Sequence, residues 1–268
     1  MKLATPVLSD AATLTADNET LPVANLQTKQ PTKVWRSNNL SVNVVADLGG
    51  DYSIDLFALM FSNATADATW RIRAAAEESE LTADPAYDTG PMTFAAGING
   101  QYLIYSQGAP ETYSRTSGYH TFLPKQFRWW RADIFDPDNA DGYLDFGRLY
   151  IADSFTPQRT FSYGWTQQWM DGQVRDKSLG NQTYPQERNT YRRISGQFRW
   201  QSESDMYGEL YQLQRKRGSS KDVLLITDEL KTDRLMDWSV YGLMTDIEPI
   251  TGSTFRLYET TLTIEEMI

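Results

Sequence analysis

The feature that most constrains the fold is a long succession of short segments rich in β-branched and aromatic residues, separated by clusters of Gly, Pro, Asn and Asp. Such segments are typical of β-strands, and the clusters between them are typical of turns. The strand-like segments are Val42–Asp47, Ile54–Phe61, Thr69–Ala75, Gln101–Ser106, Arg128–Ile134, Arg148–Ile151, Tyr191–Gln201, Val223–Thr227, Trp238–Leu243 and Thr254–Ile264. The pattern predicts a mainly β protein made of sandwiches or barrels.

One stretch, 203–217, is predicted to form an amphipathic helix. Ser202 is suited to cap its N-terminus, acidic residues follow in the first turn, and apolar residues recur at helical spacing. Basic residues end the stretch, where they favour the negative end of a helix dipole, and Gly218 stands at the stop position. The stretch 74–81 also has helix-forming residues, but it lies between strand and turn signals.

Composition excludes many kinds of catalytic site. The 268 residues include no cysteine, which rules out disulfides, thiolate zinc sites, iron–sulfur ligation and cysteine nucleophiles. The single histidine, His120, has no histidine companion for a metal site, and no Gly-x-Ser-x-Gly elbow accompanies it. There is also no glycine-rich phosphate loop. We therefore predict no catalytic residues, no cofactor and no metal, and hence a protein that is not an enzyme.

Charge and hydropathy limit the partners. The formal net charge is −10, which is unsuited to coating DNA or anionic lipid, so no sequence-specific nucleic-acid partner is expected. No stretch approaches the roughly 20 apolar residues of a membrane span. The N-terminus does not resemble a signal peptide, and we expect a protein made in a cytoplasm.

The composition changes near residues 152–160, which suggests a domain junction. Residues 1–153 contain 11 basic and 19 acidic residues, whereas residues 154–268 contain 14 and 16. The acidity therefore belongs mainly to the first part, and the sequence predicts two domains, 1–153 and 154–268.

Acidic residues offer two weaker candidates for chemistry. The loop Asp136–Gly142 resembles a calcium-binding loop, but with Gly142 at the sixth position the first position is Pro137 and the twelfth is Arg148. The EF-hand template therefore fails, and a tight turn or a cation held in another way stays open. Neighbouring carboxylates such as Glu77 and Glu78 would serve a hydrolase only if they faced each other across a substrate.

Two aromatic and basic stretches stand out as candidate contact sites. Trp129 and Trp130 are consecutive in a predicted strand, so only one of them can face the core. The other is exposed, covered by a loop or part of an interface. Trp129 is the candidate glycan contact. In the strand 191–200, the alternation places Arg193 and Arg199 on one face. Arg and aromatic residues are favoured at interfaces. The candidate subunit-interface residues are Arg193, Arg199, Trp165 and Trp169.

Four short motifs follow one another in the first part of the chain: Asn25-Leu26, Trp35-Arg36-Ser37, Asp47-Leu48-Gly49 and Phe127–Ile134. In this order they resemble discoidin-like (F5/8 type C) jelly-roll modules, over about residues 20–151. The resemblance implies a β-sandwich that binds carbohydrate or lipid headgroups through loops at one end.

The second part of the chain has a characteristic order of segments: Phe161–Trp165, the Arg-rich strand 191–200, the helix 203–217, Val223–Asp228, Val240–Leu243 and the ending Thr263–Ile268. This order resembles tail proteins of tailed bacteriophages, over about residues 155–268. It implies a tail-tube-like β-sandwich or barrel with one flanking helix. In distal tail proteins the ring-forming domain often comes first, whereas here the jelly roll precedes it.

Together these resemblances imply a virion structural protein. Its expected role is a ring-forming component of the distal tail or tail tip, joining the tail tube to the baseplate or host-recognition apparatus. Expected partners are further copies in a six-fold or three-fold ring, other phage tail proteins and a host surface glycan. The alternative is a carbohydrate-binding adhesin or lectin-like module without an assembly role.

Overall fold

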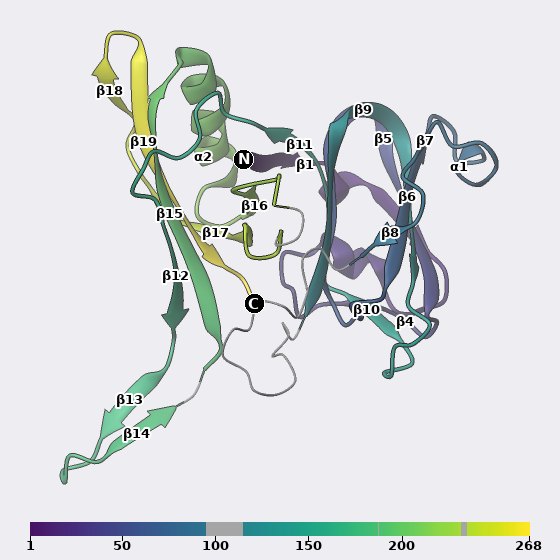
Figure 1. Ribbon diagram of the computed structural model, residues 1–268, viewed down its shortest axis with the longest axis horizontal. Coiled ribbons are helices and arrows are strands. Elements are labelled where there is room, and N and C mark those ends of the chain that lie inside the picture. Colours follow the sequence, from purple (N-terminus) through teal and green to yellow (C-terminus); the bar gives the residue numbers. More distant parts are fainter. Residues whose placement is uncertain (95–114, 187, 232–234) are drawn as a thin grey trace. The chain divides into compact units, whose positions relative to one another are not determined.

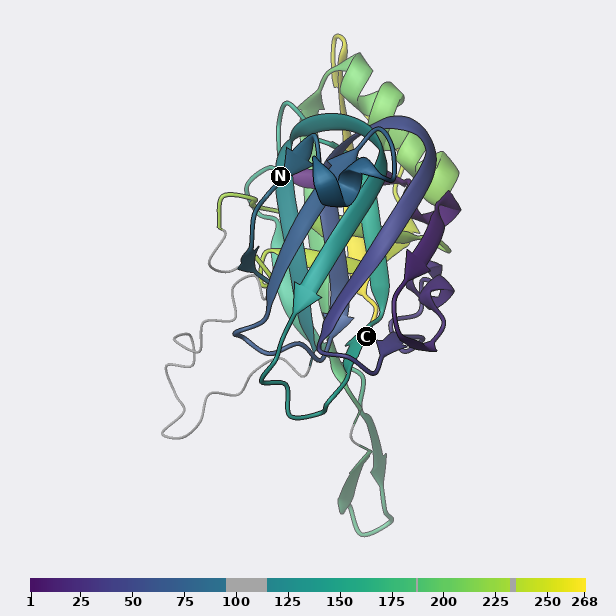
Figure 2. The same cartoon turned by 90° about the vertical axis from the view of Figure 1, so that its right-hand side faces the viewer.

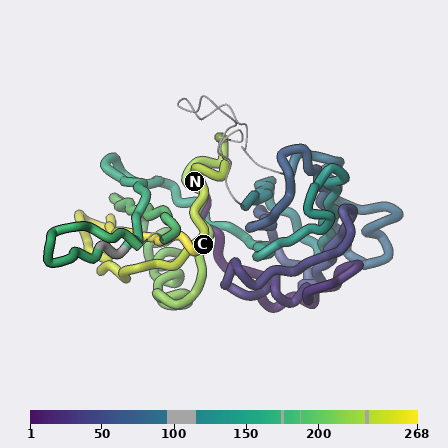
Figure 3. Tube along the Cα trace, turned by 90° about the horizontal axis from the view of Figure 1, so that it is seen from below, coloured from purple at the N-terminus to yellow at the C-terminus, as the bar shows by residue number. Residues whose placement is uncertain are grey.

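A computed structural model describes residues 1–94, 115–186, 188–231 and 235–268 (Figure 1). The chain divides into two compact units. The N-terminal unit comprises Lys2–Ser154 and Ile226–Ser239, and the C-terminal unit comprises Met1, Phe155–Leu225 and Val240–Ile268. The segment 226–239 thus groups with the N-terminal unit, although the sequence places it in the second domain. In Figure 3 most of the N-terminal unit is coloured purple to teal and most of the C-terminal unit green to yellow, as their positions in the sequence require.

The N-terminal unit is a jelly-roll β-sandwich, as the sequence predicts. Its large sheet has the order β1-β11-β5-β9-β6-β7, with β2 beside β5 and β8 beside β6, and its small sheet has the order β10-β4-β3. The elements are β1 (Lys2–Val7), η1 (Ser9–Ala11), β2 (Thr13–Ala16), β3 (Glu19–Leu21), η2 (Val23–Gln27), β4 (Trp35–Ser37), β5 (Ser41–Ser62), β6 (Thr69–Ala75), α1 (Glu80–Ala83), β7 (Tyr87–Asp88), β8 (Met92–Thr93), β9 (Thr116–Phe135), β10 (Leu144–Phe146) and β11 (Arg148–Phe155).

The core of this unit lies between its two sheets. Trp35 on the small sheet stacks on Phe146 with ring centroids 5.4 Å apart. Phe57 on the large sheet contacts Trp70 and Trp130 at 6.1 and 6.3 Å. All five side chains are buried, and the buried Phe94 links the two groups, with its ring centroid 5.3 Å from Trp70 and 5.8 Å from Phe146.

Strands β5 and β9 form the longest ladder of the sandwich, and Figure 2 shows their curved course. Val42 lies opposite Ile134, and Leu56 lies opposite Thr121. The sequence predicts separate strands at 42–47 and 54–61, but both lie in β5. Its register with β9 shifts between Asp47 and Tyr52, where Gly49 has a φ of 76°. The chain therefore bends inside one strand instead of ending it. The predicted strand Gln101–Ser106 lies outside the described residues.

The C-terminal unit is an antiparallel sheet with one flanking helix and a separate hairpin. The sheet has the order β12-β15-β19-β17-β16, with β18 beside β19, and β13 pairs with β14 alone. The elements are β12 (Thr166–Asp171), β13 (Val174–Lys177), β14 (Thr183–Gln186), β15 (Thr190–Gln201), η4 (Ser204–Leu210), α2 (Tyr211–Arg217), β16 (Asp222–Ile226), β17 (Ser239–Ile247), β18 (Thr251–Thr254) and β19 (Leu257–Glu266).

The helix predicted at 203–217 is present, with one difference. Its first part, Ser204–Leu210, is a π-helix, and only Tyr211–Arg217 is α-helical. The Ser202 hydroxyl accepts a hydrogen bond from the Asp205 N–H at 3.1 Å, and Gly218 ends the helix with a φ of 54°. Both termini are therefore as predicted. Within the described ranges, no helix is long and apolar enough to cross a membrane.

Candidate functional site

Trp129 and Trp130 on β9 point to opposite faces of the large sheet. Trp130 is fully buried, whereas Trp129 is half-buried and packs on Val45, Ala75 and Leu81. The Arg128 guanidinium lies 5.3 Å from the centroid of the Trp129 ring. Trp129, the candidate glycan contact, is therefore partly covered.

An ion pair holds the cation beside Trp129. The Arg128 Nε and Nη2 donate to the two carboxylate oxygens of Asp47 at 2.7 and 2.8 Å. This contact lowers the pKa of Asp47 below its usual range. The pair limits access to the ring, so a ligand at Trp129 has to approach past Arg128.

A second aromatic cluster lies on the same unit, around the only histidine. The Tyr87 hydroxyl is 3.0 Å from His120 Nε2, and the Phe122 ring stacks on both side chains at 5.2 Å. The Lys125 Nζ lies 5.8 Å from the Tyr87 ring centroid. Trp130 packs 5.6 Å from Phe122 and supports the cluster from the core.

Burial controls the protonation of this cluster. It lowers the pKa of His120 and raises the pKa of Tyr87. At neutral pH the cluster therefore presents a neutral imidazole, a neutral phenol and half-buried ring faces. Sequence reasoning missed this cluster. His120 and Phe122 are two residues apart in a strand, which places them on one face, but nothing in the sequence indicates that Tyr87 joins them.

The strand β15 has the predicted alternation for most of its length. Arg193 is half-exposed and its Nε donates to Glu265 at 2.7 Å, while Arg199 is exposed and donates to Gln197 at 2.7 Å. Arg192, on the opposite face, is buried and paired with Glu266. Trp200 departs from the alternation, because the register with β19 shifts between Phe198 and Gln201 and turns the ring outward.

The two tryptophans predicted at an interface lie at or beside β12. Trp169 is 59% exposed and stands opposite Arg192, whose guanidinium is 5.8 Å from its ring centroid. Trp165 directly precedes β12 and is half-buried. Trp169 and Arg193 are thus on neighbouring strands, whereas Arg199 lies towards the other end of β15.

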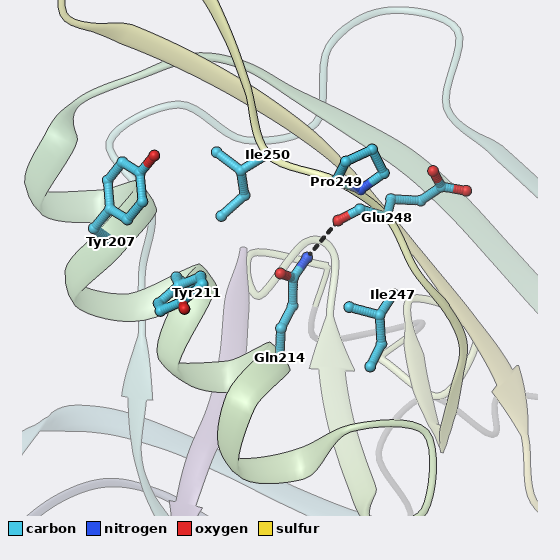
Figure 4. A pocket seen from close by; sticks show the side chains of 7 residues that line it. All are labelled: Tyr207, Tyr211, Gln214, Ile247, Glu248, Pro249 and Ile250. Atoms are coloured by element: carbon cyan, nitrogen blue, oxygen red, sulfur yellow. Dashed lines mark hydrogen bonds between the residues drawn. The ribbon is translucent and has the colours of Figure 1, made fainter.

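A groove of about 410 Å³ opens between the helix and the segment that joins β17 to β18 (Figure 4). Tyr207 and Tyr211 form one wall, and Ile247 and Ile250 lie on the opposite side. The Gln214 Nε2 donates to the Glu248 carbonyl at 3.1 Å and so ties the two sides together. The lining is mainly apolar and aromatic, which is typical of a binding groove.

The acidic loop 136–142 is held by hydrogen bonds within the protein. The Asp136 carboxylate is buried and accepts from the Thr65 N–H at 2.8 Å, the Thr65 hydroxyl at 2.6 Å and the Asn139 amide at 3.0 Å. These donors occupy both carboxylate oxygens, as expected for a tight turn. In the part of the chain that the structure describes, no three His, Asp or Glu side chains are grouped to hold a metal ion.

Comparisons with known proteins were made at three levels. No model of a protein family matches the chain, and no curated protein matches it. Solved structures similar to it include the family 32 carbohydrate-binding module of Clostridium perfringens NanJ in complex with galactose, with a TM-score of 0.38 and 13% identity over 57% of this chain and 100% of the module.

Two further structures have comparable similarity. The lectin domain of lectinolysin complexed with Lewis B antigen has a TM-score of 0.38 and 9% identity over 57% of this chain and 99% of that domain. A Ruminococcus gnavus GH29 fucosidase in complex with fucose has a TM-score of 0.39 and 10% identity over 56% of this chain. This chain spans 27% of the length of the fucosidase. The structures similar to this chain are mainly carbohydrate-binding modules.

Proposed function

We propose that this protein is a non-enzymatic structural subunit that assembles with further copies of itself through its C-terminal unit. The distribution of exposed large apolar side chains carries the proposal. Ten of the fifteen in the described residues belong to this unit, although it holds fewer than half of the residues. They are Tyr163, Trp169, Leu179, Tyr184, Trp200, Tyr207, Tyr211, Ile247, Phe255 and Ile268. Contiguous exposed apolar surface marks interaction sites, and three of the ten, Tyr207, Tyr211 and Ile247, line one groove.

The finer assignment rests on the sequence resemblance to phage tail proteins. It makes the chain a ring component of the distal tail or tail tip, in a six-fold or three-fold ring that joins the tail tube to the baseplate. The protein would be made in the host cytoplasm and function in the virion. A ring needs one surface patch on each side of the subunit, and these patches touch in a head-to-tail manner. A negatively charged subunit would also allow DNA to pass without adhering.

Light scattering on the purified protein, combined with negative-stain microscopy, tests the proposal. We expect a mass that equals several whole chains, and we expect ring-shaped particles. A mass of one chain at every concentration would refute self-assembly.

A second candidate function is carbohydrate binding by the N-terminal unit, as in an adhesin. The half-buried cluster of Tyr87, His120 and Phe122 favours it, since stacked rings beside hydrogen-bonding groups suit the apolar faces and hydroxyls of a sugar. Trp129 is the alternative contact on the same unit. Both functions are compatible in one protein.

A glycan array with the wild type and four variants separates these sites. If the cluster binds, His120→Gln and Phe122→Ala lose the signal, whereas Trp129→Ala keeps it. The reverse pattern assigns binding to Trp129. Trp169→Ala, in the other unit, is the matched control and should bind like the wild type. Absence of binding by the wild-type protein would exclude the carbohydrate-binding function for the glycans on the array.

A further inference from the structure

The hairpin β13–β14 lacks a core of its own. Its two strands pair only with each other, with Lys177 opposite Thr183. The side chains from Asp176 to Gln186 are all exposed, and Leu179 at the tip is fully exposed. A two-stranded hairpin is marginally stable by itself in water, so such a hairpin gains stability when a partner covers it.

The tip of this hairpin is nevertheless well formed. The Ser178 N–H donates to the Gln182 carbonyl at 2.9 Å, and the Asn181 N–H donates to the Ser178 carbonyl at 2.9 Å. Asn181 has a φ of 61°, a conformation that asparagine tolerates better than most residues. The turn therefore has a defined backbone conformation with Leu179 at its tip, which reduces the backbone entropy lost when the tip binds.

The groove beside the helix has the complementary shape and chemistry. Tyr207 packs edge-on against Tyr258 with ring centroids 5.1 Å apart, so this wall exists without a ligand. Gln214 uses its amide nitrogen within the protein, and few polar groups face the groove. The mainly apolar lining suits an apolar side chain such as that of Leu179, and a volume of about 410 Å³ leaves room for neighbouring residues of the hairpin tip.

The charges beside the tip and the groove also match. Lys177 is exposed next to the tip, and Glu248 is exposed in the segment that bounds the groove. Exposed ion pairs contribute little to affinity, but opposite charges orient the two surfaces.

The hairpin and the groove lie at opposite ends of the C-terminal unit. The hairpin follows β12 at the end where Asp171 pairs with Thr190, and the groove lies near the other end of β15, where Gln201 pairs with Tyr258. The 12 residues of β15 span about 40 Å. Figures 1 and 2 both show this separation. The hairpin therefore cannot enter the groove of its own chain.

We propose that the β13–β14 hairpin of one copy docks in the tyrosine groove of a second copy, with Leu179 between Tyr211 and Ile250. This inference rests on the proposed self-assembly and assigns the surfaces that make it. The contact joins two different patches, so repeating it produces a closed ring or an open filament.

Cysteine cross-linking tests the contact directly, because the wild-type chain has no cysteine. With Leu179→Cys and Ile250→Cys in one chain, mild oxidation should give a ladder of covalent oligomers on a non-reducing gel. Each single variant should give dimers at most. Leu123→Cys combined with Ile250→Cys is the matched control, since Leu123 is an exposed leucine of the N-terminal unit. No ladder with the first pair would overturn the inference.

Light scattering distinguishes failure of this inference from failure of self-assembly. We expect Leu179→Asp to reduce the mass to one chain, and Leu123→Asp to leave the oligomer unchanged. An equimolar mixture of Leu179→Asp and Ile250→Asp should form dimers, because one hairpin and one groove remain intact. If Leu179→Asp keeps the wild-type mass, the copies assemble through another surface. If the wild type has the mass of one chain and the double variant Leu179→Cys, Ile250→Cys gives no ladder, both proposals are wrong.

Discussion

The substitution Asp55→Leu should strongly destabilise the N-terminal unit, because it leaves the Lys2 ammonium buried beside an apolar side chain. Lys2 on β1 and Asp55 on β5 are both buried, and the ammonium contacts the carboxylate. The Ser154 N–H also donates to Asp55 at 2.7 Å. Glu229 Oε2 lies 3.7 Å from the ammonium, which also attracts the Asp153 carboxylate.

The magnitude follows from which charges remain after each change. Removing one partner of a buried ion pair costs about 3–5 kcal/mol. Glu229 still attracts the Lys2 ammonium in this variant. We therefore expect Asp55→Leu to lower the free energy of unfolding by about 3 kcal/mol, the lower end of this range. Lys2→Met should also destabilise the unit, because it leaves the buried carboxylate without its counter-ion, although the Ser154 N–H and hydroxyl still donate to it. Combining Lys2→Met with Asp55→Leu removes both charges, and the remaining cost is the loss of the Asp55 acceptor for the Ser154 N–H and hydroxyl, about 1–2 kcal/mol.

Urea unfolding followed by near-ultraviolet circular dichroism measures these differences for the wild type, both single variants and the double variant. The reasoning requires that the double variant be more stable than either single variant. If the two single costs simply add in the double variant, the pair is not coupled, and the account of the buried ammonium is wrong.

Three further changes test other parts of the N-terminal unit. Gly118→Ala should cost about 1–3 kcal/mol in urea unfolding, because its methyl group would lie 2.7 Å from the buried Phe94 ring; unchanged stability would show that Phe94 yields easily. Arg71 lowers the pKa of Asp88 to about 2, so its carboxylate stabilises the fold above about pH 4, and this stabilisation is lost as the pH falls towards 2. The stability difference between the wild type and Asp88→Asn should disappear over that range, and a constant difference would contradict the assignment. Burial lowers the pKa of His120 from 6.5, so the unfolded chain takes up the proton first and stability falls as the pH drops below about 6.5. Thermal melts of His120→Gln should lack this component, and equal pH dependence in both proteins would contradict it.

Local alternation in the sequence predicts much of the fold. It places Trp129 and Trp130 on opposite faces and separates Arg193 from the buried face of β15. It fails where the backbone departs from a regular strand. The two strands predicted at 42–47 and 54–61 are one bent strand, β5, with the bend at Gly49. In β15, the register shift before Gln201 exposes Trp200, which the alternation places on the buried face. Such irregularities depend on pairing with distant strands, which a local pattern does not contain.

The aromatic cluster shows the same limit for a candidate site. His120 and Phe122 share a face by local alternation, but Tyr87 reaches them only because β6 pairs with both β7 and β9. The residue that hydrogen-bonds His120 therefore comes from another strand, 33 positions away. No residue close to His120 in the sequence indicates its hydrogen bond with Tyr87, so the local pattern does not predict the cluster.

The groove beside the helix has two walls, and the sequence pattern predicts only the one that the helix forms. Met206 and Leu210 belong to the predicted apolar stripe and are buried, so Tyr207 and Tyr211, one position later, lie at its edge and are about 43% and 44% exposed. The opposite wall depends on β17, whose register with β19 shifts between Met244 and Ile247 and leaves Ile247 exposed. The groove is therefore a product of tertiary pairing, and partial unfolding of this sheet would abolish it while leaving the hairpin tip intact. Docking of Leu179 should accordingly fail in variants that restore a regular β17–β19 register, even when both tyrosines are kept.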